Sequence, residues 1–257
     1  MIIGAQLYTL RDFCKTPDDI HETLKKVADI GYTAVQMSGI GKIDYALFKE
    51  YCDECGLDVV LTHNSFDRII NDTEQLIKDH EILGCDYIGI GAPAPDQCDT
   101  AEHFTAFIDA LAQAAEKIHA AGKTFCYHNH HLEFEEKENG YTAMEYMIKK
   151  FPKHVHYVVD TYWVDYAGTT TSAEHLKRLA GQIDCVHYKD LIEVEKDGKT
   201  EKTMAPVGEG LLDWPAINAA CEAGGTKWIV VEQDICDGDP FECLKTSYEN
   251  MKKWGYR

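Results

Sequence analysis

Residues 2–37 read IIGAQLYTLRDFCKTPDDIHETLKKVADIGYTAVQM, and this stretch holds one repeat of the pattern that decides the fold. It opens and closes with a short apolar run, which is typical of a parallel strand covered on both faces. Thr16 followed by Pro17 indicates the start of a helix, and Gly31 indicates its end. Between these signals the apolar residues recur at helical spacing: Ile20, Leu24, Val27 and Ile30. The stretch therefore predicts a strand, a helix and a second strand.

The same pattern continues along the whole chain of 257 residues. Later helices are predicted over residues 101–121 before Gly122, over residues 214–223 before Gly224, and over residues 240–254. Eight apolar runs are candidate strands: Ile2 to Leu7, Thr33 to Met37, Leu57 to Thr62, Tyr87 to Ile90, Thr124 to Tyr127, Val155 to Val159, Cys185 to Tyr188, and Trp228 to Val231.

Eight β-α units in about 250 residues favour an α/β fold that closes on itself as a (β/α)8 barrel. An open, doubly wound sheet is the alternative. No Pro/Ser-rich linker or charge block divides the chain, so we expect residues 1–257 to form a single domain.

One irregularity follows the seventh predicted strand. Residues 191–205, LIEVEKDGKTEKTMA, alternate in polarity around Asp197-Gly198, which is a short-range hairpin signal. We expect a short β-hairpin at this position, lying as a flap over the mouth of the barrel.

Composition limits the partners and the compartment. A formal net charge of −19 opposes binding to nucleic acid or to an anionic membrane. The start, MIIGAQLYTLRD, contains no basic leader before a long apolar segment, and the ten cysteines are not spaced as a disulfide framework. We therefore expect a cytoplasmic protein with reduced thiols.

The residues that follow the predicted strands are rich in metal-ligand types. The active site of a (β/α)8 barrel lies at the carboxyl ends of its strands, so these residues should meet at one mouth. Asp160 follows strand six, His187 lies in strand seven and Glu232 follows strand eight, while HNHHLEF follows strand five. Converging charged groups need a cation between them, and mixed imidazole and carboxylate ligands suit Mn²⁺, Fe²⁺, Co²⁺ or Zn²⁺. We expect one metal among Asp160, His187, Glu232 and a strand-five residue.

Several motifs in this order carry a family resemblance: GAQLYTLRD, HNHHLEF, DTYWV, HYKD, PVGEGLLDW and VEQD. The chain resembles the xylose isomerase-like superfamily of sugar phosphate isomerases and epimerases, which is related to endonuclease IV. The likeness covers essentially the whole chain, and it implies a barrel fold and a divalent metal.

The resemblance also implies a ligand set of Glu, Asp, His and Glu from the last four strands. It assigns Asp160, His187 and Glu232 to three of these positions. Strand five departs from the family pattern, because Tyr127-His128-Asn129 stands at the strand end and Glu133 comes later. The fourth ligand is either Glu133 or His128. Mn²⁺ is the metal expected first, and Zn²⁺, Co²⁺, Fe²⁺ and Mg²⁺ are the alternatives.

Isomerisation of a keto-sugar, or inversion of a carbon beside a carbonyl, requires a base and a way to stabilise an enediolate oxygen. A metal stabilises such an oxygen. We expect Glu232 or His128 to act as the base and Lys189 to act as a cation or proton donor. Glu209, in the sequence VGEG, is either a further site residue or a polar turn residue.

The substrate would be oriented by residues near strands one, three and six. The candidates are Gln6, Tyr8, Arg11, His63 and Trp163, whose ring could cover the apolar face of a sugar. No glycine-rich segment with Lys or Arg follows strands seven and eight, where barrels commonly bind phosphate. Unphosphorylated sugars, polyols or glycosides are therefore the expected substrates.

Other functions fit part of the pattern. A lyase or dehydratase acting beside a carbonyl would use the same metal site. An endonuclease IV-like phosphodiesterase requires several metals and a basic DNA track, whereas this chain has 25 basic and 44 acidic residues. A non-catalytic sugar-binding subunit is a third alternative. Aromatic residues such as Trp163 and Tyr166 are compatible with the interface of a homo-oligomer.

Overall fold

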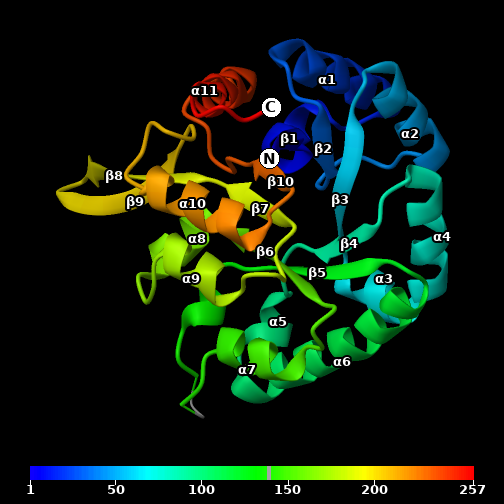
Figure 1. Cartoon of the computed structure of the whole chain (residues 1–257), viewed down its shortest axis with the longest axis vertical. Coiled ribbons are helices and arrows are strands. Elements are labelled where there is room, and N and C mark those ends of the chain that lie inside the picture. Colours follow the sequence, from blue (N-terminus) through cyan, green and yellow to red (C-terminus); the bar gives the residue numbers. More distant parts are fainter. Residues whose placement is uncertain (138–139) are drawn as a thin grey trace.

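The computed structural model of the protein describes residues 1–137 and 140–257, which form a closed barrel of eight parallel strands (Figure 1). The strand order around the barrel is β1-β10-β7-β6-β5-β4-β3-β2, so strands that follow one another in the barrel series are also neighbours in space. The strands are β1 (Ile2–Gln6), β2 (Ala34–Met37), β3 (Asp58–Asn64), β4 (Tyr87–Ile90), β5 (Thr124–His128), β6 (His156–Asp160), β7 (Cys185–Tyr188) and β10 (Trp228–Val231).

Pairing of β1 with β10 closes the sheet, with Ile2 opposite Trp228 and Ala5 opposite Val231. This pairing confirms the predicted closed (β/α)8 barrel over the open sheet. All eight predicted strands are present, and their ends differ from the predicted ones by two residues at most.

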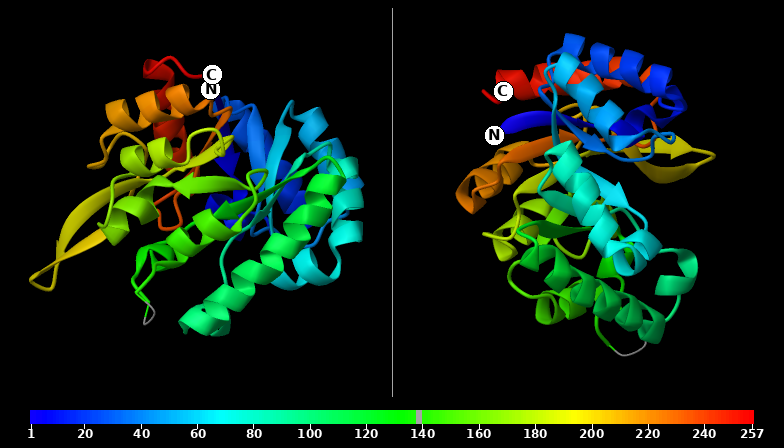
Figure 2. Two further views of the ribbon diagram at one scale, coloured as in Figure 1. Left: turned by 60° about the horizontal axis from the view of Figure 1, so that its bottom comes forward. Right: turned by 90° about the vertical axis from the view of Figure 1, so that its right-hand side faces the viewer.

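The helices lie around the outside of the barrel, as Figure 1 and Figure 2 show. They are α1 (Pro17–Ile30), α2 (Tyr45–Glu54), α3 (Phe66–Asn71), α4 (Thr73–Leu83), α5 (Pro95–Cys98), α6 (Ala101–Ala120), α7 (Ala143–Lys150), α8 (Thr161–Ala167), α9 (Ser172–Arg178), α10 (Trp214–Gly224) and α11 (Pro240–Lys253), with 3-10 helices η1 (Leu7–Phe13) and η2 (Leu132–Phe134).

Local signals set the helix ends. Thr16 and Asp19 form a capping box at the start of α1, and Gly31 ends that helix with φ of 119°. At α10 the end lies one residue later than predicted, because Gly225 rather than Gly224 adopts the left-handed conformation. Among the described residues, none of the helices combines the length and the apolar character that a bilayer span requires.

Two apolar layers hold the barrel together. The larger layer lies between strands and helices, whereas a small inner layer fills the barrel itself. Successive side chains of a strand point to opposite faces, so the residue two positions after an inner one faces the barrel axis again. The alternation is interrupted in β3, where the pairing with β2 shifts register and Val60 and Leu61 both join the inner layer. The buried residues of the inner layer are Ala34, Val60, Leu61, Cys126, Val158, Cys185 and Val230.

The hairpin predicted after the seventh strand is present as β8 (Asp190–Lys196) and β9 (Lys199–Ala205). Its turn has positive φ at both central residues, 52° at Asp197 and 74° at Gly198. The base of the hairpin packs against α8 through contacts of Leu191 and Met204 with Tyr162. Its outer half is largely exposed and projects away from the barrel (Figure 2).

Asp190 anchors this hairpin to the segment before α10. Its Oδ2 accepts hydrogen bonds from the backbone N–H of Gly208 at 2.8 Å and of Gly210 at 3.0 Å, and from Trp214 Nε1 at 2.7 Å. Its Oδ1 accepts from the backbone N–H of Leu191 at 2.8 Å. A Cβ at position 210 would lie 2.3 Å from the Asp190 Oδ1, so the close approach requires glycine.

We predict that Asp190→Asn lowers the free energy of unfolding by about 2–4 kcal/mol, because an amide N–H₂ would then face buried N–H donors. Denaturant unfolding followed by circular dichroism measures this loss. Asp197→Asn in the exposed hairpin turn is the matched control and should change stability by less than about 0.5 kcal/mol. Equal stability of the two variants would contradict the anchoring role of Asp190.

Candidate metal centre

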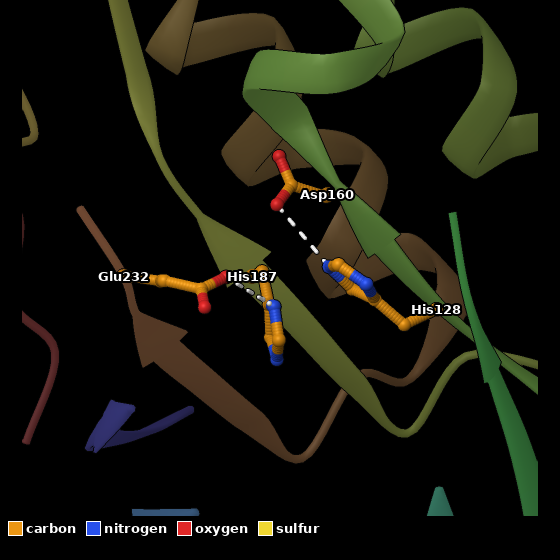
Figure 3. A group of neighbouring side chains, drawn as sticks. All are labelled: His128, Asp160, His187 and Glu232. Atoms are coloured by element: carbon orange, nitrogen blue, oxygen red, sulfur yellow. Dashed lines mark hydrogen bonds and ion pairs between the residues drawn. The ribbon is translucent and has the colours of Figure 1, made fainter. Parts of the chain in front are cut away.

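Four buried side chains from four consecutive positions of the barrel meet at its carboxyl mouth (Figure 3). His128 ends β5, Asp160 ends β6, His187 lies in β7 and Glu232 directly follows β10. One ligand atom from each residue lies within 4.8 Å of the others. Each of these residues stands two positions after an inner-layer residue, which explains why all four face the axis.

Hydrogen bonds on the far side of each ring orient the two histidines. His128 Nδ1 lies 3.0 Å from the carbonyl of Gly91 and donates to it, so Nε2 faces Asp160 Oδ2 at 3.2 Å. His187 Nε2 lies 2.6 Å from Gln36 Oε1, so Nδ1 faces Glu232 Oε2 at 3.0 Å. A second-side hydrogen bond of this kind fixes the ring orientation of metal-binding histidines.

Asp160 divides its carboxylate between two tasks. Its Oδ1 accepts from the backbone N–H of Trp163 at 3.1 Å and so caps the start of α8. Its Oδ2 faces both His128 Nε2 and Lys189 Nζ. The cap fixes the carboxylate in one orientation, because a side chain bonded through Oδ1 cannot rotate freely.

Burial and charge act in opposite directions on the ionisable groups of this cluster. Burial lowers the pKa of His187, against the charge of Glu232. Burial also lowers the pKa of His128, but the hydrogen bond and charge of Asp160 outweigh it, so this pKa is raised. For Glu232 burial raises the pKa, yet Lys189 and His187 together hold it well below its usual range.

Two further charged residues, Lys189 and Asp234, complete the mouth. Lys189 is buried, and its Nζ lies 3.1 Å from Asp234 Oδ2. Burial and the charge of Glu232 raise the pKa of Asp234 to about 6. Sequence reasoning did not select Asp234 or Gln36. The two-residue period of β2 could have found Gln36, which follows the inner residue Ala34 by two. Asp234 lies beyond the end of β10, where the strand period does not apply.

The four ligand residues fit a divalent metal. Two imidazole nitrogens and two carboxylates form the mixed donor set that Mn²⁺, Fe²⁺, Co²⁺ and Zn²⁺ accept. Among the described residues, His187 Nδ1 is buried without a hydrogen bond of proper geometry, although it lies 3.0 Å from Glu232 Oε2, which also contacts Lys189 Nζ at 3.0 Å. A buried nitrogen without a partner is costly, and a cation bound between it and the carboxylate would satisfy it.

Glu133 is not brought into this group. It is fully buried, and its oxygens accept from Tyr127 Oη at 2.8 Å and from the backbone N–H of His130 at 2.7 Å. Tyr127 belongs to the outer layer, because it immediately precedes the inward-facing His128 and its side chain points to the opposite face of the strand. Of the two residues considered for strand five, His128 therefore lies beside Asp160 and Glu133 does not.

A cavity of about 430 Å³ reaches His128 and Glu232, whereas Asp160 and His187 are fully buried behind its wall. Three of the predicted substrate-binding residues, Tyr8, His63 and Trp163, line it. The β8-β9 hairpin contributes no described residue to its walls, so the expected position of the hairpin as a flap over the mouth is wrong. The lining residues are Tyr8, Ser38, His63, Asn64, Gly91, Ala92, His128, His130, Trp163, Lys189, Glu232 and Asp234.

The other three predicted substrate-binding residues lie outside the cavity wall. Gln6 is buried at the end of β1, where its Oε1 accepts from the backbone N–H of Tyr8 at 3.3 Å. Arg11 donates to the backbone carbonyls of Tyr8 and Asp234, each at 2.9 Å. Glu209 is exposed, and its Oε1 accepts from Asn250 Nδ2 at 2.8 Å.

Comparison with known proteins identifies relatives of this barrel. A family model for xylose isomerase-like TIM barrels matches residues 24–253. No curated protein sequence matches the chain. Among solved structures, a sugar phosphate isomerase/epimerase from Parabacteroides distasonis is 23% identical with a TM-score of 0.78, and the match covers 98% of this chain and 97% of that one.

Two further solved structures have the same fold. An L-ribulose 3-epimerase is 17% identical with a TM-score of 0.71, and the match covers 98% of this chain and 94% of the other. A protein of Bacillus anthracis described as the probable 3-DHS dehydratase is 11% identical with a TM-score of 0.73, and the match covers 98% and 99% of the two chains. At these identities the likeness shows a shared fold.

We predict that His128→Ala weakens the binding of Mn²⁺ or Zn²⁺ by about 100-fold or more, because it removes a ligand atom. Glu133→Gln is the matched control and should change the affinity by less than about tenfold, since its oxygens are engaged by Tyr127 and His130. Titration of metal against a chelating dye measures both. If Glu133→Gln weakened metal binding more than His128→Ala, Glu133 rather than His128 would be the fourth ligand.

Proposed function

The chain belongs to the xylose isomerase-like TIM barrel family, and from this premise we propose that it is a divalent-metal-dependent isomerase or epimerase of keto-sugars. The observation that carries the proposal is the convergence of His128, Asp160, His187 and Glu232 beside a cavity that His128 and Glu232 line. Two proteins with this fold, a sugar phosphate isomerase/epimerase and an L-ribulose 3-epimerase, support the same reaction class.

The metal would be held by His128, Asp160, His187 and Glu232, and when bound it would stabilise negative charge that develops on substrate oxygens. Mn²⁺ is our first choice, with Zn²⁺, Co²⁺, Fe²⁺ and Mg²⁺ as alternatives. The donor set favours the first four over Mg²⁺, which prefers oxygen ligands.

The residues around the cavity would carry the proton transfers. Glu232 removes a proton from the carbon beside the substrate carbonyl. His128, the alternative base, could take this role only if it did not bind the metal, because its Nδ1 is engaged by the Gly91 carbonyl. Lys189 lines the cavity and donates a hydrogen bond to the substrate oxygen that becomes negative. Return of the proton to the former carbonyl carbon, with transfer of the hydroxyl proton between the two oxygens, gives isomerisation. Delivery of a proton to the opposite face of the same carbon by a second donor, while the base keeps the first proton, gives epimerisation.

The side walls would orient the sugar. Trp163 presents its ring to the cavity, where it can cover the apolar face of a sugar. The Nε2 of His63 is buried without a hydrogen bond and is available to a substrate hydroxyl. Tyr8 is more than a third exposed at the opening of the cavity, with the Arg11 guanidinium 4.5 Å from the centre of its ring.

We predict that the Mn²⁺-loaded protein, incubated in deuterium oxide with a panel of keto-sugars, incorporates deuterium beside the carbonyl of its substrate. His187→Ala should lower the rate of incorporation by about 10³-fold or more, because a metal ligand is lost. Glu193→Gln, on the exposed hairpin, is the control and should retain the wild-type rate. Proton NMR detects both the label and any isomer formed. If the metal-bound protein incorporated no deuterium into any sugar of the panel, the proposal would be wrong.

A dehydratase is the second candidate, because the Bacillus anthracis protein with this fold is described as one. A dehydratase also removes a proton beside a carbonyl, so it would share the base and the metal. The same experiment distinguishes the two classes, because mass spectrometry would detect a product lighter by one water rather than an isomer.

A second cavity, of about 410 Å³, adjoins the first and supports a substrate larger than a free sugar. Ser38, His63 and Asn64 belong to both cavities, so the two meet along these side chains. Lys42 and Arg68 line the far part, together with apolar and hydroxyl groups from the loop after β2. A mixed polar and apolar wall of this kind suits the distal ring of a glycoside.

We predict that Ile40→Trp, which narrows the second cavity, lowers kcat/KM for a keto-glycoside by about tenfold and leaves kcat/KM for the matching free keto-sugar unchanged. Ile82→Trp, on an exposed position of α4, is the matched control. Steady-state kinetics with both substrates provide the comparison. A parallel loss for both substrates would argue that the second cavity is not a substrate subsite.

A further inference from the structure

Lys189 contacts every carboxylate at the mouth of the barrel. Its Nζ lies 2.9 Å from Asp160 Oδ2, 3.0 Å from Glu232 Oε2 and 3.1 Å from Asp234 Oδ2. The side chain is 1% exposed, so water does not screen these contacts. A lysine buried this deeply stays charged only because the three carboxylates surround it.

Two of these contacts use oxygens that a metal would need. Asp160 Oδ2 also faces His128 Nε2 at 3.2 Å, and Glu232 Oε2 also faces His187 Nδ1 at 3.0 Å. These pairs bring an imidazole and a carboxylate of the proposed ligand set together. The ammonium of Lys189 therefore occupies the oxygens on which a dication would bind.

The third contact offers the ammonium another position. Asp234 does not belong to the ligand cluster, and both of its oxygens lie within 3.2 Å of Lys189 Nζ. The backbone carbonyl of Asp234 is held by Arg11, which fixes this segment in place. Lys189 Nζ can thus leave Asp160 and Glu232 and remain in contact with Asp234.

The charges at the mouth favour such an exchange. Asp160, Glu232 and Asp234 carry three negative charges, and Lys189 supplies one positive charge. The remaining net charge of −2 matches a dication, provided that Lys189 stays in the site. Ammonium and metal would then bind side by side, with the ammonium on Asp234 and the metal on Asp160 and Glu232.

We propose that Lys189 is an internal cation that competes with the metal for Asp160 and Glu232 and moves onto Asp234 when the metal binds. This inference rests on the proposed metal site. It assigns two functions to one residue: Lys189 neutralises the acidic mouth before loading, and it stands over the cavity beside Asp234 afterwards. Asp234 acts as a positioning residue, because it works by holding Lys189.

The test compares metal affinity in Lys189→Met and in wild type. Methionine keeps most of the side-chain volume and removes the charge, so Lys189→Met should bind Co²⁺ about tenfold more tightly or better. The visible absorption of bound Co²⁺ should keep its shape, because the ligands are unchanged. Lys202→Met is the matched control, since its ammonium contacts the backbone carbonyls of Asp165 and Tyr166 and the Tyr166 ring, outside the cavity.

The role of Asp234 requires a double-mutant cycle. Asp234→Asn should weaken Co²⁺ binding in the wild-type background, because it removes a negative charge and also the position to which Lys189 moves. In the Lys189→Met background only the charge effect remains, so the loss of affinity should be smaller. Equal losses in both backgrounds would overturn the transfer of Lys189 to Asp234.

Thermal unfolding of the metal-free proteins adds a readout independent of metal. Lys189→Met without metal should unfold at a lower temperature than wild type, because three carboxylates are then left without a counter-charge. Added metal should stabilise Lys189→Met more than it stabilises wild type.

The outcomes separate this inference from the function on which it rests. Equal or weaker Co²⁺ binding by Lys189→Met, with a wild type that binds through His187, overturns the competition alone. Binding that persists in His187→Ala overturns the proposed ligand set. Absence of binding in wild type and in Lys189→Met overturns both.

Discussion

The alternation of side chains along a parallel strand is the constraint on which the candidate site depends. Cys126, Val158, Cys185 and Val230 fill the inside of the barrel, and the next inward position on each strand is His128, Asp160, His187 or Glu232. The register sets Asp160 and Val230 on either side of His187, so closure of the sheet brings the four groups together. The site is thus built by strands, whose positions the core fixes, and it needs no loop to assemble it.

The same alternation explains how much the sequence could predict. Caps, apolar runs and helical periods are local signals, so all eight strands and the closed barrel could be predicted from them. Asp160, His187 and Glu232 could be selected because they stand at strand ends. For strand five, the two-residue period favours His128, which continues the inward series from Cys126. Glu133 lies in a 3-10 turn, where no period applies, and its burial against Tyr127 became visible only in three dimensions.

The β8-β9 hairpin shows what local sequence signals do not predict. Asp197-Gly198 predicted the turn, and the turn is present, but the direction of the hairpin depends on contacts distant in sequence. Asp190 ties its first residue to Gly208, Gly210 and Trp214, and Met204 packs on Tyr162. These contacts hold the base of the hairpin against α8 and direct its tip away from the mouth. A pattern of residues in one segment does not specify its partners in another.

Charge at the mouth links folding to function. Two buried carboxylates and a partly buried third, in a chain of net charge −19, would oppose folding unless a cation accompanied them, and Lys189 provides one from within the chain. A lysine suits this position better than an arginine would. Its ammonium is a compact charge on a flexible stem, whereas a guanidinium binds carboxylates in a fixed bidentate geometry. The barrel can therefore fold around the ammonium and still yield two of its carboxylates to a metal. A bidentate arginine would hold those carboxylates against the metal, and a neutral residue would leave the folded chain with an uncompensated acidic centre.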